Sequence, residues 1–342
     1  MPVLDGPLLI ENRVQAIRDL HAKVHNPRAQ LDLSGGIDSA VLLGLLVRAQ
    51  GAENVTTVYS NIHSGNEFQV RAQMCAEAFG VRLVVLDLTS IFDELTSKMQ
   101  ESLEAAGYDI QEVRQRIDSD RTVLGSIRSC LRAPVGRGYN RMTGGGIRHG
   151  TGNECEDRFL RFYQKGGDGE VDTNPIDMLA KGEVFQLARA LGVPAPLIDA
   201  MPSPDLHGVG EAHNDEDELR ELTGVEWTYS RIDMESGSYT KVGSIERMSR
   251  FLDTGAEAAL FGHTELSDAD FERMTGEATR FFPNHTPSEI QGLLRSCRKL
   301  EHTSRHKANP NIPSLGTRAE LVSAGLITDD LPSAMPTTPN QV

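Results

Sequence analysis

The sequence predicts an α/β fold: a doubly wound parallel sheet with flanking helices, followed by a helical C-terminal extension. Two observations carry this prediction. Short apolar or β-branched runs alternate with segments whose apolar residues have helical spacing, and a glycine-rich turn joins the first such run to a strongly apolar helix former. Strands that alternate with helices at this interval form βαβ units, whose strands run parallel beneath helices on both faces.

The elements are expected in a regular order. Apolar residues near helical spacing predict an opening amphipathic helix over residues 8–24. Strands are predicted over residues 31–33, 55–59, 81–88 and 146–150. Helices are predicted over residues 40–47, 68–79, 91–116 and 182–191, the last of them closed by Gly192 with Pro194 just beyond it.

The glycine-rich turn, residues 34–39, has the composition of a phosphate-binding loop. It lies between a strand and a helix N-terminus, where free backbone N–H groups and the helix dipole favour an anion. Gly35 and Gly36 let the backbone curl around phosphate oxygens without a Cβ in the way. Ser34 and Ser39 add hydroxyl donors, and the Asp38 carboxylate is suited to hold a Mg²⁺ ion bound to the same phosphates.

This loop, Ser-Gly-Gly-Ile-Asp-Ser, lacks the Gly-Lys-Ser/Thr ending of a Walker loop. It resembles the SGGxDS signature of the ATP pyrophosphatases, which cleave ATP between the α and β phosphates and transfer AMP to a carboxylate, an amide or a similar oxygen. The alternative is a plain glycine turn between a strand and a helix. The signature indicates ATP and says little about the second substrate.

Composition narrows the class of protein. The chain has 342 residues, 39% of them hydrophobic, which is ample for a core. A net charge of −15 argues against a nucleic-acid surface, which would need a basic face. No apolar run approaches the roughly 20 residues of a membrane span. The four cysteines are isolated and residues 1–6 lack secretory features, so we expect a reduced, cytoplasmic protein.

A second constellation follows between residues 150 and 181. It consists of the turn Gly-Thr-Gly-Asn at 150–153, Glu156, the loop Gln-Lys-Gly-Gly-Asp-Gly-Glu-Val-Asp at 164–172, Pro175 and Lys181. Taken singly, these are a turn, a loop and a helix-surface lysine. Together they resemble the ammonia-dependent NAD⁺ synthetases, whose GTxN turn, glutamate, TKxGDGGxD loop, proline and lysine occur in this order. Further similar segments are residues 202–206, 215–219, 229–233 and 306–313.

The resemblance implies roles for individual residues. Asp38 and Glu156 would be Mg²⁺ ligands, and Asp38, Lys181 and Asp172 the catalytic residues. ATP would be bound by Ser34, Gly35, Gly36, Asp38, Ser39, Thr151, Lys181 and Ser203. The carboxylate dinucleotide would be bound by Arg132, Lys165, Asp168, Asp172, His306 and Lys307. The resemblance also implies a homodimer whose dinucleotide pocket lies at the subunit interface, and residues 154–162 are our candidate for part of that interface.

The resemblance covers about residues 8–313 and suggests a division of the chain. Residues 1–230 would form the ATP pyrophosphatase or synthetase-like domain, residues 231–290 a mostly helical insertion, and residues 291–316 a segment that completes the synthetase fold. Residues 317–342 would be a tail whose end is disordered. The acidic run at 214–221 is predicted to be a solvated helix face rather than a metal site.

Three departures from the family pattern fall near the site. Asp32 stands where a small residue is usual, and we expect this carboxylate to be paired or peripheral. Cys130 replaces an arginine, so a bidentate phosphate contact is lost unless Arg128 compensates, while Arg132 is kept. Arg148 and His149 occupy a strand that should be apolar, which predicts a local rearrangement or a changed pocket.

The function that follows is ATP-dependent amidation of nicotinic acid adenine dinucleotide (deamido-NAD⁺) by ammonia, giving NAD⁺, AMP and pyrophosphate. The chemistry needs no covalent nucleophile, because the carboxylate is activated as an acyl adenylate. The nearest alternative is a synthetase-like paralogue that adenylates and amidates a different carboxylic acid. A third possibility is a non-enzymatic nucleotide-binding protein, which the intact Asp38, Glu156, Asp168 and Lys181 argue against.

Overall fold

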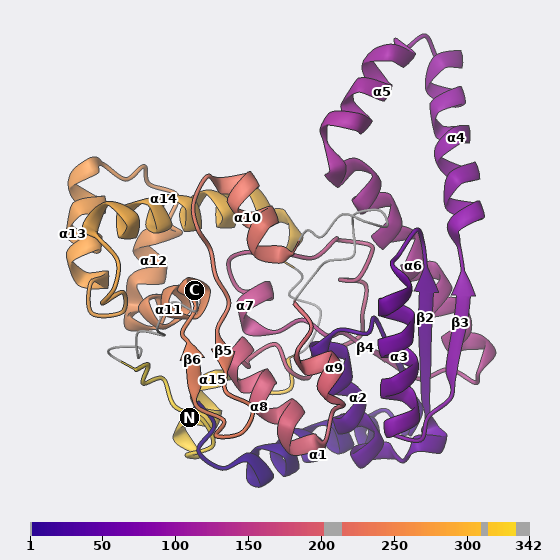
Figure 1. Cartoon of the computed structure of the whole chain (residues 1–342), viewed down its shortest axis with the longest axis horizontal. Coiled ribbons are helices and arrows are strands. Elements are labelled where there is room, and N and C mark those ends of the chain that lie inside the picture. The colour runs from indigo at the N-terminus through magenta and orange to yellow at the C-terminus, as the bar shows by residue number, and fades with distance from the viewer. Residues whose placement is uncertain (1, 202–213, 309–313, 333–342) are drawn as a thin grey trace, which may run out of the picture.

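The computed structural model describes residues 2–201, 214–308 and 314–332. Its centre is a parallel sheet in the order β3-β2-β1-β4. Ala29 of β1 (Ala29–Asp32) is paired with Val55 of β2 (Val55–Asn61) on one side and with Ile147 of β4 (Ile147–His149) on the other, and β3 (Leu83–Asp87) extends the sheet beyond β2. The predicted α/β class and parallel sheet are confirmed (Figure 1).

Two sets of helices cover the sheet. The connections from β1 to β2 and from β2 to β3 are α2 (Ile37–Gln50) and α3 (Asn66–Ala78). The return to β4 runs through α4 (Thr89–Ala105), α5 (Ile110–Ser119) and α6 (Arg121–Met142), and α6 packs across β1 and β2. Right-handed crossovers place this return connection on the opposite face from α2 and α3.

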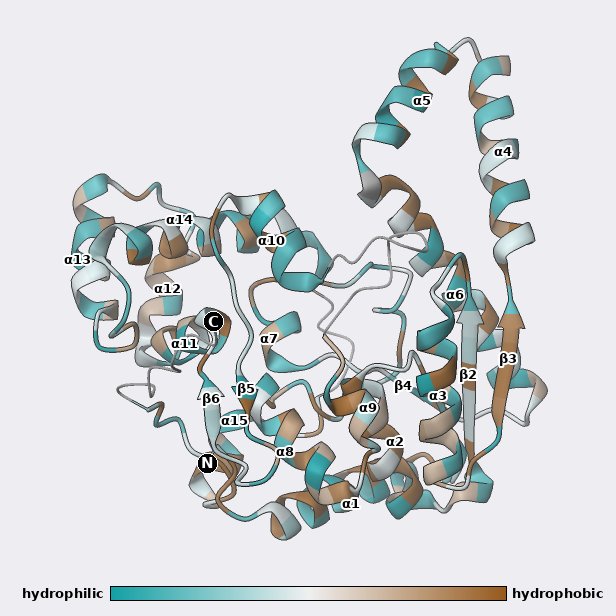
Figure 2. Ribbon diagram, viewed as in Figure 1, coloured by the Kyte–Doolittle hydropathy of each residue, from teal (hydrophilic) through white to brown (hydrophobic). Residues whose placement is uncertain are grey.

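The middle of helix α2, residues 40–46, is apolar and buried on every side, while polar residues stand near its two ends. Figure 2 shows its hydrophobic colouring. It packs against the sheet, α1 (Gly6–Lys23), α8 (Lys181–Leu191) and α9 (Ala195–Ile198), so each of its faces has an apolar partner. A helix that is hydrophobic all round is stable only in such a position. This core fixes the phosphate-loop end of α2.

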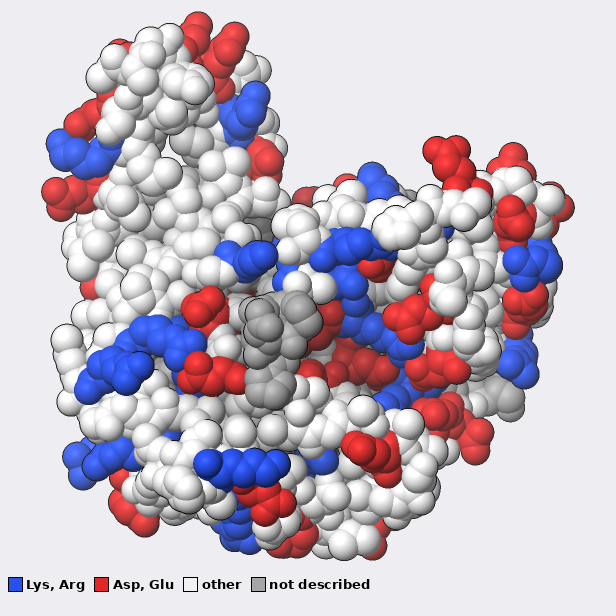
Figure 3. Space-filling view, turned by 180° about the vertical axis from the view of Figure 1, so that it is seen from behind, with Lys and Arg blue, Asp and Glu red and all other residues white. Residues whose placement is uncertain are grey.

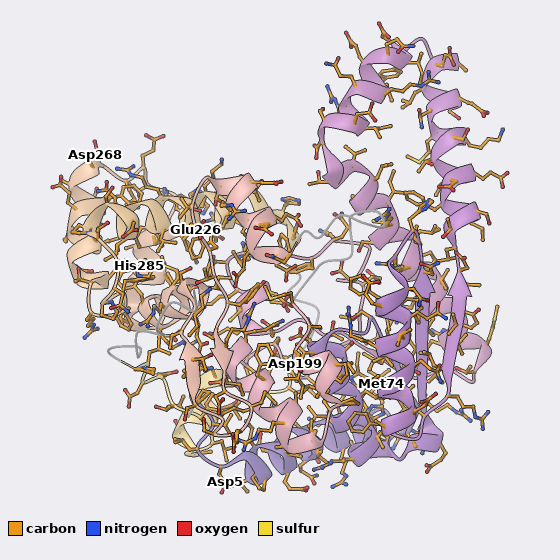
Figure 4. All side chains as sticks on the ribbon, in the orientation of Figure 1. Asp5, Met74, Asp199, Glu226, Asp268 and His285 are labelled. Carbon is orange, nitrogen blue, oxygen red and sulfur yellow. The ribbon has the colours of Figure 1, made fainter. Side chains whose placement is uncertain are left out.

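A helical lobe follows the sheet half. It contains α10 (Asp215–Thr223), α11 (Ser244–Phe251), the π-type turn Leu252–Ala256, α12 (Glu257–Leu260), α13 (Asp268–Ala278) and α14 (Pro287–Ser304). Strands β5 (Arg231–Ile232) and β6 (Tyr239–Lys241) form a small antiparallel pair, and α15 (Arg318–Ser323) follows the lobe. In Figure 4, Asp268 on α13 and Met74 on α3 mark opposite sides of the molecule.

The lobe has its own core, which corrects one prediction. Phe159 and Leu160, from the segment proposed as a dimer contact, are buried in this core with Trp227, Phe251 and Phe282. Only Glu154–Asp157 of that segment is helical, as α7. Residues 154–162 therefore present little apolar surface to a partner.

Other differences lie between β3 and β4. The single helix expected over 91–116 is a hairpin of α4 and α5 that projects from the body (Figure 1). Helix α6, with 22 residues and Pro134 inside it, was not predicted. On the face in Figure 3, acidic and basic side chains are interspersed, with acidic ones at the hairpin tip. Among the described residues, no helix is long and apolar enough to cross a membrane.

The histidine in β4 is accommodated by a second histidine. His21 of α1 uses Nδ1 to donate to the Asn26 carbonyl at 2.7 Å, which leaves its Nε2 to accept from Nε2 of His149 at 3.0 Å. The two rings also stack, with centroids 5.2 Å apart. Burial, with a smaller effect of His21, lowers the pKa of His149 to about 3, so the pair is neutral.

This pair should make stability fall as the pH falls. The unfolded imidazole has a pKa of about 6.5, so below that pH and above about 3 only the unfolded state binds the proton at His149. The free energy of unfolding should decrease by up to about 1.4 kcal/mol per pH unit in this window because of this group. Urea unfolding of wild type, His149→Phe and the exposed control His302→Gln measures it. An unchanged slope in His149→Phe would contradict the prediction.

Candidate active site

The loop at residues 34–39 is held in a fixed shape by its own hydrogen bonds. Ser39 Oγ donates to the Gly36 carbonyl at 2.9 Å, and Gly36 N donates to Ser34 Oγ at 3.2 Å. Gly35 has a φ of +81°, and a Cβ there would lie 2.4 Å from the Phe68 carbonyl oxygen. Only glycine fits that position. The N-terminus of α2 is thereby presented to open space with its backbone N–H groups free to bind an anion.

One cluster joins three distant parts of the chain at the mouth of this loop. Nζ of Lys181, at the start of α8, lies 2.7 Å from Oδ2 of Asp38 on α2 and 2.8 Å from Oε1 of Glu156 on α7. Asn153 Nδ2 donates to the other Asp38 oxygen at 2.8 Å, and Asn153 also caps α7. The two predicted metal ligands and the predicted catalytic Lys181 thus meet at one point.

Burial and charge set the protonation of this cluster. Burial alone would lower the pKa of the Lys181 ammonium, but the Asp38 and Glu156 carboxylates outweigh it and raise that pKa above its ordinary range. Burial raises the pKa of Glu156, an effect that Lys181 partly offsets and Asp38 reinforces. Lys181 is therefore a permanent cation here and cannot serve as a base. Two carboxylates converge on one cation, a geometry that suits a metal ion as well as an ammonium.

A cavity of about 370 Å³ opens over the loop and the cluster. Most of the predicted ATP residues line it, namely Ser34, Gly35, Gly36, Asp38, Ser39, Thr151 and Lys181, and so does the predicted metal ligand Glu156. Three residues predicted for the acid substrate line the same cavity, namely Arg132, Asp168 and Lys307. Asp168 is oriented by Ser129 Oγ, which donates to it at 2.7 Å. One continuous cavity therefore joins the two expected substrates.

Three other predicted residues, Lys165, Asp172 and His306, are absent from the cavity lining, and a fourth, Ser203, is not described. Asp172 forms a bidentate pair with Arg137, at 2.8 and 3.0 Å, and accepts from the Arg148 backbone N–H at 2.8 Å. Lys165 Nζ donates to the His306 carbonyl at 3.3 Å. Ser203 lies outside the residues that the structure describes. The roles of these four residues stay predictions.

Asp215 is a residue that the sequence reading assigned to the wrong environment. The run 214–221 was predicted to be a solvated face, but Asp215 is only 5% exposed and lines the cavity. Burial, and then the neighbouring Glu156, raises the pKa of Asp215 to about 8. A run of acidic residues gives no signal as to which of its side chains is buried. The similarity of residues 215–219 to the family's DExEL segment was the one indication that this run lies near the site.

Two of the departures compensate each other. The Arg148 guanidinium on β4, itself 2% exposed, lies 2.5 Å from Asp32 Oδ2 on the adjacent β1, and Gln30 donates to the other Asp32 oxygen at 2.6 Å. Arg148 also donates to the Ala133 carbonyl of α6 at 2.8 Å. The predicted pairing of Asp32 is confirmed, and its partner explains the arginine in a central strand.

The third departure is not compensated by its neighbour. Arg128 stacks over the Phe92 ring, 5.7 Å from its centroid, and is absent from the cavity lining. Cys130 is also absent from that lining, and its Sγ lies 3.9 Å from the Lys165 carbonyl oxygen. Arg132 faces the cavity with its Nε donating to the Ser60 carbonyl at 3.3 Å. Of the three, only Arg132 presents a cation to the cavity.

Comparison with known proteins agrees with this geometry. A family model described as NAD synthase matches residues 9–235. The chain belongs to the NAD synthase family. It is 34% identical over 206 residues to the NH(3)-dependent NAD(+) synthetase of Methanococcoides burtonii, an alignment that covers 60% of this chain and 69% of that protein. It is 31% identical over 314 residues to the synthetase of the same name from Methanosarcina acetivorans, covering 89% of this chain and 97% of that protein.

Solved structures share the fold. An NMN synthetase from Francisella tularensis superposes with a TM-score of 0.57 at 21% identity, covering 81% of this chain and 94% of that one. A glutamine-dependent NAD(+) synthetase from Cytophaga hutchinsonii gives a TM-score of 0.58 at 14% identity, covering 87% of this chain and 49% of that one. These likenesses extend the fold assignment to the helical C-terminal region.

The Asp32–Arg148 pair should show strong energetic coupling. Arg148→Met leaves a carboxylate without its cation and should destabilise the fold by about 2–4 kcal/mol, below the value for a fully buried pair because Asp32 is partly exposed. Asp32→Ser combined with Arg148→Met should lose at least about 1 kcal/mol less than the sum of the single changes. Denaturant unfolding of the four proteins measures the coupling, and strict additivity would refute the pairing.

Proposed function

We propose that this member of the NAD synthase family joins ammonia to the carboxylate of deamido-NAD⁺, using ATP, to give NAD⁺, AMP and pyrophosphate. The observation that carries the proposal is the Lys181 ammonium held between Asp38 and Glu156 at the mouth of the SGGIDS loop. The relatives named above, both NH(3)-dependent NAD(+) synthetases, support the same substrates. We also expect the four cysteines, all unpaired, to stay reduced in the cytoplasm.

The residues that line the ATP side of the cavity would have different roles in adenylate formation. Ammonia does not attack a free carboxylate usefully, so the carboxylate oxygen first attacks the α-phosphate and pyrophosphate leaves. The loop N–H groups and the Ser34 and Ser39 hydroxyls would bind the departing phosphates. Thr151, and Ser203 by resemblance, would add hydroxyl donors. Lys181, permanently charged, would stabilise negative charge on the phosphates as it develops.

We propose Mg²⁺ as the cofactor beside ATP, held by Asp38 and Glu156. These residues fit it, because their oxygens already converge on one cation, the Lys181 ammonium. The lining also carries more carboxylates than cations: Asp32, Asp38, Glu156, Asp168, Asp215 and Glu218 against Arg71, Arg132, Lys181 and Lys307. Such a lining would repel a bare polyphosphate. Bound Mg²⁺ would neutralise phosphate charge, and it needs only one or two protein carboxylates when phosphates complete its shell.

The acid substrate would occupy the part of the cavity near Arg132, Asp168 and Lys307. The same substrate would also be bound by three residues that do not line the cavity: Lys165, Asp172 and His306. The resemblance to the synthetases supports a site completed by a second copy of the chain, as in a homodimer. The dimer contact would involve a surface other than Phe159 and Leu160, since the lobe core encloses both.

A second candidate function keeps the adenylation and changes the acid. The specific observation is that Arg128 turns to Phe92 and Cys130 offers no charge, so Arg132 alone remains of that basic segment. A carboxylic acid with fewer phosphates than deamido-NAD⁺ would need no further cation there. The two candidates share every ATP-side residue and differ only in the acid.

Removing either carboxylate of the cluster should abolish adenylate formation. Asp38→Ala and Glu156→Ala each remove a proposed metal ligand and a partner of Lys181, without removing core volume. Exchange of labelled pyrophosphate into ATP should fall at least about a hundredfold in each. Glu226→Ala, an exposed carboxylate of the lobe visible in Figure 4, is the matched control and should exchange normally. Near-normal exchange in either site variant would overturn the assignment.

The acid substrate is tested with purified protein, ammonium chloride, Mg·ATP and a panel of carboxylates that includes deamido-NAD⁺. Robust NAD⁺ formation is expected, and Arg132→Ala should weaken deamido-NAD⁺ use about ten- to a hundredfold through a lost charge-assisted contact. Cys130→Arg should leave that reaction unchanged or improve it. AMP release with another carboxylate, none with deamido-NAD⁺, and harm from Cys130→Arg would establish the second candidate instead.

A further inference from the structure

Two buried carboxylates flank the proposed catalytic pair. Glu154 lies two residues before Glu156 on α7, and Glu183 lies two residues after Lys181 on α8. Glu154 is 6% exposed and Glu183 is fully buried. A buried carboxylate is tolerated only when cations or hydrogen-bond donors compensate the lost water. One compensating group is local, because Arg158 at the end of α7 lies 3.1 Å from Glu154. The remaining compensation comes from later in the chain.

Two arginines supply the compensation. Arg318 of α15 donates to both oxygens of Glu183, at 2.8 and 2.9 Å. Arg250 of α11 donates to Glu154. The two arginines meet at one oxygen of Asp329, Arg250 at 2.8 Å and Arg318 at 2.7 Å. The result is a closed chain of charges from α7, through α11 and α15, to α8.

Local structure alone cannot hold the catalytic pair. Helix α7 has only four residues, and a single turn has no stability of its own in water. Besides the Lys181–Glu156 ion pair itself, α7 is tied to the start of α8 by a backbone hydrogen bond from Glu154 N to the Leu179 carbonyl at 2.9 Å and by a contact from Lys181 N to Cys155 Sγ at 3.4 Å. The Glu183 carboxylate accepts a hydrogen bond from the Ala180 N–H at 2.8 Å and so caps the N-terminus of α8. The carboxylate that binds Arg318 therefore also fixes where α8 begins.

We propose that Arg250 and Arg318 are positioning residues, through which the C-terminal region holds Glu156 and Lys181 in register with Asp38. Both arginines lie beyond residues 9–235, the part that the family model matches. Figure 1 shows α11 beside α7 and α15 beside α8. The identity of the reaction in this proposal rests on the proposed function. The positioning role of the two arginines rests only on their contacts.

A matched control separates positioning from general stability. Arg298 of α14 is a half-buried arginine of the lobe whose hydrogen bonds, within the described part of the chain, go to the Leu260 and Thr264 carbonyls, at 2.6 and 2.7 Å. Arg298→Met should loosen the lobe without touching α7 or α8. Arg250→Met and Arg318→Met remove the same amount of charge at positions that reach the site.

The first readout needs no turnover. Hydrogen exchange at the amides of residues 154–158 and 180–184 should rise at least about tenfold in Arg250→Met and Arg318→Met, and stay at the wild-type rate in Arg298→Met. Calorimetric Mg·ATP binding should weaken in the first two only. Asp329→Asn keeps both arginines and should raise the exchange rates of the same amides by a smaller factor. This variant tests the proposal even if an arginine variant does not fold.

The second readout is kinetic. In pyrophosphate exchange, kcat should fall about ten- to a hundredfold in both arginine variants, with the KM of the acid unchanged, because the displaced groups act on the phosphates. Arg→Lys at each position should restore part of kcat. Equal losses in Arg298→Met at matched thermal stability, or unchanged exchange at α7 and α8, would overturn the positioning role. A wild-type protein that makes no NAD⁺ would overturn the proposed function alone, and hydrogen exchange would still test the positioning.

Discussion

The Lys181 ammonium between two carboxylates is the interaction on which the rest of this structure depends. Its partners come from α2 and α7, and Lys181 itself begins α8, so one buried cation connects three segments that the chain separates widely. Taking an ammonium out of water is unfavourable by several kcal/mol unless its partners are placed accurately. The apolar burial of α2 holds Asp38 in place. The ion pairs that Arg250 and Arg318 make with α7 and α8 hold Glu156 and Lys181 in place.

Charge compensation recurs outward from this centre. Asp32 would lack its cation if Arg148 did not replace an apolar residue of β4. Glu183 would lose Arg318, and Glu154 would keep only the local Arg158, if the arginines of α11 and α15 were absent. Apart from the Arg158 contact, each pair joins residues far apart in sequence. An acidic chain can therefore bury carboxylates beside a polyphosphate site, because interior arginines are distributed among the elements that hold the site.

The parts of the fold that the sequence predicted are those with local signals. β-Branched runs and the Gly35–Gly36 turn identify strands and a phosphate loop, because those conformations are set by a few neighbouring residues. Helix α6 was missed because Pro134, Gly136 and Gly138 lower helix propensity, and tertiary packing on β1 and β2 overrides it. The burial of Asp215 and the partner of Arg148 are tertiary facts, which local pattern does not contain.

Arg148 lies between the two halves of the proposed site. Its side chain binds Asp32, which lines the cavity beside the phosphate loop. Its backbone N–H donates to the Asp172 carboxylate at 2.8 Å, and its carbonyl accepts from the Asp172 N–H at 2.8 Å. Because Asp172 is the residue assigned to the acid or ammonia, one strand residue ties the ATP side to the acid side. Removing the Arg148 side chain would release Asp32, whereas the two hydrogen bonds to Asp172 use the backbone of Arg148 and do not depend on that side chain. The polar residue in this parallel strand is therefore explained by the carboxylate that it pairs with on β1.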